Sequence, residues 1–168
     1  MKPRWLSLSL VSLLLAMALP VAASNMDWSM VGSCGEIDES SLTLYEYSGA
    51  RLQFKSGQTG TITVRYPVTA YGNTNGLQPP WDVLRLTAVD DSVSGSVTVK
   101  LVSVDECSGV EEEMCSVSGG GTPASPNCAI CIFPPDIDFQ VFSYYIEGTL
   151  TRSSTSANEA IVTVSLGH

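Results

Sequence analysis

Residues 61–66, with the sequence TITVRY, place Ile62, Val64 and Tyr66 at alternate positions between polar residues. Successive side chains of a strand point to opposite faces, so this stretch predicts a half-buried β-strand. The same period of two returns at residues 84–88, 96–101, 142–150 and 162–166, and shorter candidates lie at 42–47 and 50–55. Turn residues separate these stretches. The pattern predicts an all-β, antiparallel two-sheet β-sandwich of about seven strands, with a small β-barrel as the alternative.

The first residues of the chain lack the alternating pattern of a strand and have a pattern of their own. Lys2 and Arg4 precede an apolar run, which ends in small residues at Ala22 and Ala23, as in a secretory signal peptide. We therefore expect residues 1–23 to be removed and the protein to be secreted, whether extracellular, on the cell surface or periplasmic, with no transmembrane segment. Residues 24–41 are expected to form an N-terminal arm. Residues 42–168 are expected to form the sandwich domain, with a long Gly-, Pro- and Cys-rich loop at 116–136.

The charge balance excludes some classes of partner. The chain has 17 acidic and 8 basic side chains, a formal net charge of −9. Nucleic acids and anionic membranes are bound mainly through clustered Lys and Arg, and here these residues are scattered one to a strand. We expect no nucleic-acid partner.

The chain has five cysteines, and disulfides are the expected state in an exported protein. Cys107 and Cys115 flank a turn and are the preferred pair. A second bridge from Cys34 to Cys128 or Cys131 would tie the N-terminal segment to the long loop. The odd cysteine is then either a free thiol or joins two chains.

Five acidic residues on both sides of the same turn are weak candidates for a calcium site: Asp105, Glu106, Glu111, Glu112 and Glu113. Calcium prefers carboxylate oxygens, but the spacing matches no known calcium loop, and a solvated hairpin tip explains the same residues. The sequence therefore predicts no cofactor.

Catalytic groups are scarce. His168, the last residue, is the single histidine, so Ser-His-Asp and Cys-His chemistry lack a base held by the fold. We expect no enzyme activity.

The main functional hypothesis is a structural or protein-interaction module that binds other protein chains, itself included. The expected arm carries the apolar residues Met26, Trp28 and Met30, and an extended apolar segment can add a strand to a neighbour's sheet. A disordered terminus or a strand of its own domain would explain the same residues.

The alternative hypothesis is a lectin-like, carbohydrate-binding module, with calcium as a candidate aid. Tyr71, Asn73, Asn75 and Trp81 lie in or beside one Gly- and Asn-rich loop, which offers both aromatic faces and amides to a sugar. Burial of Trp81 at one end of the core is the competing interpretation.

Overall fold

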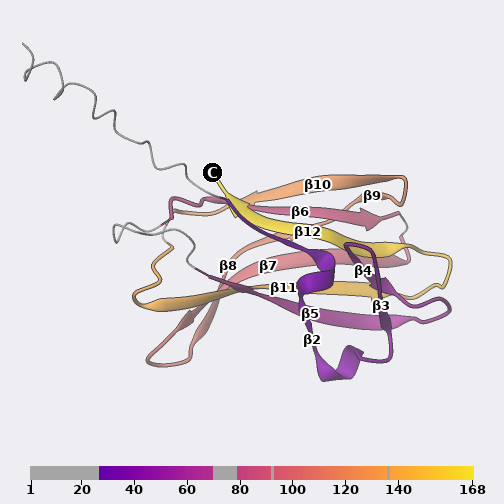
Figure 1. Ribbon diagram of the computed structural model, residues 1–168, viewed down its shortest axis with the longest axis horizontal. Coiled ribbons are helices and arrows are strands. Elements are labelled where there is room, and N and C mark those ends of the chain that lie inside the picture. The colour runs from indigo at the N-terminus through magenta and orange to yellow at the C-terminus, as the bar shows by residue number, and fades with distance from the viewer. Residues whose placement is uncertain (1–26, 70–78, 92, 136) are drawn as a thin grey trace, which may run out of the picture.

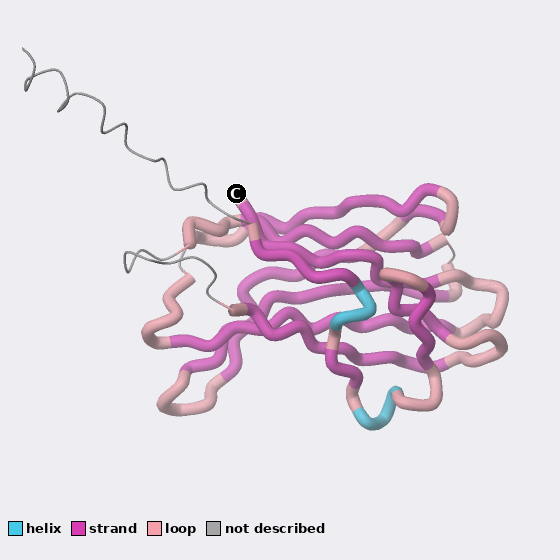
Figure 2. The backbone as a smooth tube through the Cα atoms, in the orientation of Figure 1, coloured by secondary structure: helices cyan, strands magenta, loops and turns pink. Residues whose placement is uncertain are grey.

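The computed structural model describes residues 27–69, 79–91, 93–135 and 137–168. In this part of the chain two antiparallel sheets face each other and enclose the core (Figures 1 and 2). The arrangement confirms the predicted antiparallel two-sheet β-sandwich. The expected signal peptide at residues 1–23 lies outside the described residues. None of the described helices is long and apolar enough to span a membrane.

The larger sheet has seven strands, and β12 lies near its middle. In spatial order its main path is β3 (Tyr45–Ser48), β4 (Arg51–Phe54), β12 (Glu159–Gly167), β6 (Val83–Asp90), β10 (Ser125–Ile132) and β9 (Gly121–Thr122), and β1 (Trp28–Val31) also pairs with β12.

The smaller sheet has five strands and is built around the long strand β11. Its order is β2 (Glu36–Ile37), β5 (Gly60–Val68), β11 (Phe142–Arg152), β7 (Gly95–Asp105) and β8 (Glu111–Ser118). Two short 3-10 turns, η1 (Gly32–Cys34) and η2 (Glu39–Ser41), lie between the first three strands.

The apolar residues that alternate with polar ones in the sequence are the residues that form the core. Ile62, Val64 and Tyr66 of β5 are fully buried between the sheets. The Tyr66 hydroxyl donates a hydrogen bond to the Gly32 carbonyl oxygen at 3.0 Å, so this buried polar group is satisfied. Gly32 itself packs against the backbone of Ile161, where a Cβ atom would not fit. All seven predicted strand stretches overlap an observed strand.

The described part of the expected N-terminal arm, residues 27–41, is instead part of the sandwich, which corrects the hypothesis that this part is free to bind a neighbour. Trp28 of β1 pairs with Leu166 of β12 and is only 6% exposed, and Met30 pairs with Val164. The apolar residues alternate with Ser29, so burial against the core of their own domain outweighs exposure to a partner. Met26 lies outside the described residues.

The expected long loop at 116–136 is also wrong in its larger part. The end of β8, the short strand β9 and the whole of β10 lie there. The strand breakers fall where they are tolerated: Pro123 lies in the turn between β9 and β10, and Pro126 pairs with Gly121 near the start of β10. β10 then pairs with β6 from Asn127 to Ile132.

Candidate functional site

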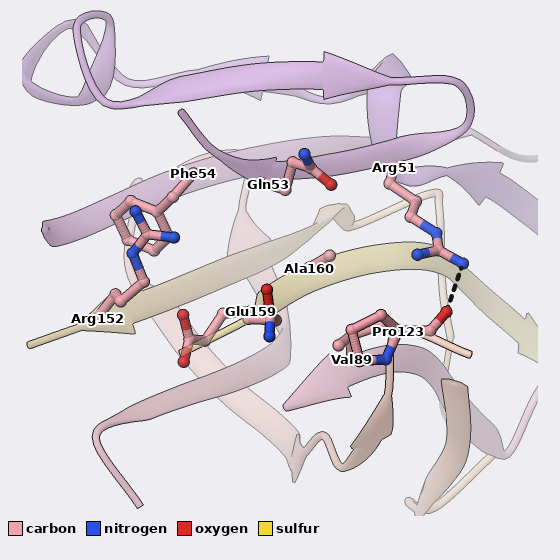
Figure 3. A pocket seen from close by; sticks show the side chains of 9 residues that line it. Arg51, Gln53, Phe54, Val89, Pro123, Arg152, Glu159 and Ala160 are labelled. Atoms are coloured by element: carbon pink, nitrogen blue, oxygen red, sulfur yellow. Dashed lines mark hydrogen bonds between the residues drawn. The ribbon is translucent and has the colours of Figure 1, made fainter. Parts of the chain in front are cut away.

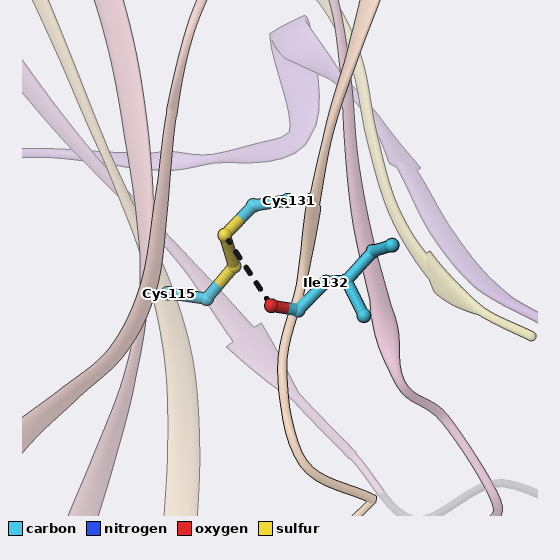
Figure 4. Close-up of a disulfide and its surroundings, with 3 residues drawn as sticks. All are labelled: Cys115, Cys131 and Ile132. Carbon is cyan, nitrogen blue, oxygen red and sulfur yellow. Dashed lines mark hydrogen bonds between the residues drawn. A yellow bond between two sulfur atoms is a disulfide. The ribbon is translucent and has the colours of Figure 1, made fainter.

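One disulfide ties the edges of the two sheets together. Cys115 of β8 is bonded to Cys131 of β10, with 6.1 Å between their Cα atoms (Figure 4). Cys115 is buried, and Cys131 packs against the core. Closing this loop of 16 residues stabilises the fold by about 3 kcal/mol in the chain-entropy model.

This bridge corrects both predicted pairings. Cys107 lies at the exposed tip of the β7–β8 hairpin and is free, so it does not pair with Cys115. Cys34 and Cys128 are also free and exposed. Cys128 and Cys131 are three residues apart on a strand and therefore face opposite sides of the sheet, so only Cys131 points at the other sheet.

Two of the acidic residues proposed for calcium, Asp105 and Glu106, have separate partners. Asp105 Oδ1 accepts hydrogen bonds from the amides of Cys107 and Ser108, at 3.0 and 2.7 Å, and those from Ser108 are the main cause of a lowered Asp105 pKa. Glu106 accepts from the Ser143 hydroxyl at 3.0 Å. Within the described residues, no three His, Cys, Asp or Glu side chains are grouped so that they could hold a metal ion.

Of the residues proposed for sugar contact, Tyr71, Asn73 and Asn75 lie outside the described residues. Trp81 is only 1% exposed, so its ring is part of the core and not a surface platform. It packs edge-on against Phe139 at 6.4 Å between ring centroids. The competing interpretation, burial of Trp81, is the correct one.

A β-bulge in β8 creates a side-chain arrangement that alternation does not predict. Cys115 pairs with Leu101 of β7, whereas Glu113 pairs with the next residue, Val102, so Met114 has no ladder partner of its own. A bulge of this kind bends the strand and re-aims the neighbouring side chains. As a result, three consecutive residues of β8 line the same hollow.

This hollow, named here the β8 hollow, has a volume of about 340 Å³. It lies where β8, β7 and β11 meet the segment after β10. Its walls are Glu112, Glu113 and Met114 from β8, Ser103 from β7, Phe142 and Tyr144 from β11, and Pro134.

Packed aromatic rings form one wall of the β8 hollow. Phe142, partly buried, lies tilted against Tyr144 at 6.3 Å between centroids, and Phe139 packs on Tyr144 at 5.0 Å. The Tyr144 hydroxyl accepts a hydrogen bond from the Asp138 amide at 2.8 Å, which fixes the ring. The wall is therefore held in place before any ligand arrives.

The β8 wall of the hollow carries acceptors. Glu112 and Glu113 are exposed. The backbone carbonyl of Glu112 accepts from the Ser103 hydroxyl at 3.4 Å, which leaves the Glu112 carboxylate outside that contact. An aromatic wall together with carboxylate acceptors can hold a ligand that combines an apolar face with hydroxyl or cationic donors.

A second, smaller hollow of about 90 Å³ lies beside strands β4, β6 and β12 of the larger sheet (Figure 3). Arg51 and Gln53 of β4 border it, and the Arg51 guanidinium donates to the Pro123 carbonyl oxygen at 3.2 Å. The Arg152 guanidinium lies over the Phe54 ring, 4.7 Å from its centroid. The volume is well below the 300–1,000 Å³ typical of ligand sites, so this hollow suits water better than a ligand of sugar size.

Glu159 is the unusual group at that second hollow. Its side chain is 2% exposed, and among the described residues neither carboxylate oxygen has a hydrogen-bond partner. Burial is the main cause that raises its pKa to about 7; Arg152 opposes the rise, and the nearby Asp90 and Asp91 add to it. Arg152 instead donates to backbone carbonyl groups, including that of Lys55 at 3.0 Å.

The outward face of the smaller sheet carries a row of alternating charge. Glu147 of β11 lies between Arg65 of β5 and Lys100 of β7, with N···O distances of 3.1 and 3.0 Å. Burial alone would raise the pKa of Glu147, but hydrogen bonds from Lys100 and Arg65 outweigh it and lower the pKa. Because the three charges neutralise one another in part, this row is a structural feature of the sheet and offers little free charge to a ligand.

His168 lies at the end of the larger sheet. Its Nδ1 atom is 3.3 Å from Asp82 Oδ1, and its side chain is 65% exposed.

No protein-family model matches the chain, and no curated protein matches it. Three solved structures with a similar fold illustrate the likeness. A family two carbohydrate esterase from Cellvibrio japonicus is 10% identical with a TM-score of 0.44, over 84% of this chain and 33% of that one. The chain thus spans about a third of the length of that esterase.

Two of the similar structures are single modules. The C-terminal family 22 carbohydrate-binding module of Clostridium thermocellum Xyn10B is 13% identical with a TM-score of 0.41, over 83% of this chain and 85% of the module. The carbohydrate-binding module TmCBM27, described as recognising mannan, is 10% identical with a TM-score of 0.37, over 83% and 86%.

Proposed function

We propose that this protein is a non-catalytic, carbohydrate-binding β-sandwich that works outside the cell, and that the β8 hollow takes one unit of a neutral sugar chain. The observation that carries the proposal is that Phe142 and Tyr144 of β11 line a single hollow together with Glu112 and Glu113 of β8. The proposal develops the carbohydrate alternative of the sequence analysis and moves its site from the 71–81 loop to β8 and β11.

Size and chemistry support this choice of ligand. A volume of about 340 Å³ lies within the range of small-ligand sites. A pyranose ring has an apolar face that can cover an aromatic ring and hydroxyl groups that donate to carboxylates. The net charge of −9 disfavours anionic polysaccharides, so we expect neutral ones.

The proposed extracellular location has two supports. Residues 1–23 have the pattern of a signal peptide. The disulfide between Cys115 and Cys131 directly follows the bulge in β8 and holds that strand against β10, and such bridges persist mainly in oxidising compartments. Reduction would therefore loosen the wall that carries Glu112 and Glu113.

Affinity electrophoresis tests the proposal. The native protein is run through gels that contain soluble neutral polysaccharides, xylan and mannan among them, and an anionic polysaccharide in a separate gel. We expect retardation by at least one neutral polysaccharide. Phe142→Ala should weaken it about tenfold, equivalent to about 1.4 kcal/mol. Tyr47→Ala is the matched control, because Tyr47 is an exposed aromatic residue on the distant strand β3.

Two results would contradict the proposal. One is equal retardation of the wild type and a folded Phe142→Ala variant, and the other is loss of binding in Tyr47→Ala. Glu112→Gln separates a sugar from a cationic ligand, because Glu112 pairs with Ser103 in the hollow: the amide keeps an acceptor for hydroxyl groups, so sugar binding should fall only a few-fold. Binding of a cation would instead be abolished and would depend strongly on salt.

A further inference from the structure

Strand β10 leaves one side of its backbone open. Residues 127–132 pair with β6 on one side. On the other side β9 reaches only Ser125 and Pro126, so in the described part of the chain the rest of β10 is an outer edge of the larger sheet. Such an edge presents unpaired N–H and C=O groups that can hydrogen-bond to another strand.

This edge lacks the charges that protect the other edges. The sequence from residue 114 to residue 135 contains no Asp, Glu, Lys or Arg. The edge strand β8 carries Glu111, Glu112 and Glu113, β2 carries Glu36, and β3 carries Glu46. Charged side chains on an edge discourage pairing with a second sheet, and β10 does not have this protection.

The side chains of β10 that point away from the core are apolar. Ile130 is 56% exposed and Ile132 is 73% exposed, and both lie on the same side of the strand as the free Cys128. Two exposed isoleucines on an open, uncharged edge form a surface to which another strand could pair with apolar contacts.

We infer that β10 pairs with β10 of a second copy of this chain, antiparallel and centred on Ile130. In this register Ile130 of each copy lies opposite Ile130 of the other, and Cys128 of each lies opposite Ile132 of the other. The two copies are related by a two-fold axis perpendicular to the sheet. The core-facing residues of both copies therefore lie on the same face of the joined sheet, and the two cores are continuous across the interface. The outward side chains then form one apolar cluster.

Charge selects this edge for contact with a second copy. Two molecules with a net charge of −9 repel each other over most of their surfaces. They approach with least repulsion along the edge that carries no carboxylate. The overlap is short, so the pair should be weak and depend on concentration, and two copies would offer two β8 hollows to one polysaccharide chain.

Sedimentation velocity over a hundredfold range of concentration tests the inference, with Ile130→Glu as the disrupting variant. In the monomer, residue 130 pairs with Arg85 of β6, so the new carboxylate suits its own fold. In the proposed pair, the carboxylate at residue 130 of one chain would face the same carboxylate of the other chain, and the two would repel each other. We expect a concentration-dependent dimer in the wild type and a monomer in Ile130→Glu. Val93→Glu, at a fully exposed turn position, is the matched control and should remain a dimer.

Mixing variants tests the register. Ile130→Glu and Ile130→Lys should each be monomeric alone, and their mixture should form a heterodimer, because opposite charges then meet at the two-fold axis. Hydrogen exchange should show slower exchange of the amides of residues 127–132 at high concentration. A monomeric wild type, a dimer that persists in Ile130→Glu, or a mixture that stays monomeric would overturn the inference. Phe142→Ala should leave the dimer intact. A failure of the sugar-binding proposal can therefore be distinguished from a failure of the dimer inference.

Discussion

Replacing Glu159 by Gln should remove most of the pH dependence of stability between pH 5 and pH 8. The pKa of this carboxyl is near 4.5 in an unfolded chain and about 7 in the folded one. Because the folded pKa is raised, the neutral form is favoured by folding. Below about pH 4.5 the carboxyl is neutral in both states and costs no stability. The free energy of unfolding falls as the pH rises from about 4.5 toward 7, and this contribution is constant at higher pH.

The size of this effect follows from the shift. A rise from 4.5 to about 7 corresponds to roughly 3 kcal/mol, and about 2 kcal/mol of this falls between pH 5 and pH 8, because stability begins to fall near pH 4.5. The wild type should therefore be about 2 kcal/mol less stable at pH 8 than at pH 5. Carboxyls with lowered pKa values, such as Asp105 and Glu147, contribute below this window.

Urea unfolding at pH 5, 6, 7 and 8, followed by tryptophan fluorescence, measures the effect. The Glu159→Gln variant should show a nearly flat profile and should exceed the wild type at pH 8. Glu39→Gln, a change at an exposed glutamate, should keep the wild-type slope. Parallel profiles for the wild type and Glu159→Gln would refute the reasoning, as would a loss of stability in Glu159→Gln at pH 8, which would mean that Arg152 stabilises the ionised form.

Three further predictions concern the packing. The double variant Cys115→Ala and Cys131→Ala should lower the free energy of unfolding by about 3 kcal/mol, measured by urea unfolding, and a reductant should then have no further effect on the midpoint. Gly95→Ala should cost about 1 to 3 kcal/mol, because its Cβ would collide with the Glu159 carboxylate; the melting temperature should recover in part when Glu159→Ala is added. Glu147→Gln should cost less than about 1 kcal/mol, and the loss should shrink in high salt, because Arg65 is half exposed.

The sequence predicts the central strands well because their alternation is a local property. Ile62, Val64 and Tyr66 show the period of two without reference to any other strand. The strand β10 is less visible, since Pro126 and the nearby glycines weigh against a strand when only local preferences are considered. Pairing with β6 from residue 127 onward outweighs those preferences, and this contact is visible only in three dimensions.

The candidate site is harder to predict because it depends on register. The three consecutive glutamates of β8 suggest a solvated turn, and only the pairing of Glu113 with Val102 shows that they belong to a strand. The same holds for the disulfide: spacing favours Cys107, whereas the inward direction of Cys131 selects the true partner of Cys115. Exposed aromatic residues in a loop are a visible signal for sugar binding, and a partly buried Phe142 beside a bulge is not.

The bulge at Met114 also affects how related sequences should be compared. The pairing of β7 with β8 is regular from Cys115 to Ser118 and again from Glu111 to Glu113. A chain without Met114 could therefore keep both parts of the pairing. The shape of the β8 hollow thus depends on one inserted residue and not on the identity of a side chain. In an alignment, a one-residue gap at this position would mark the relatives that lack the hollow, even where every other lining residue is the same.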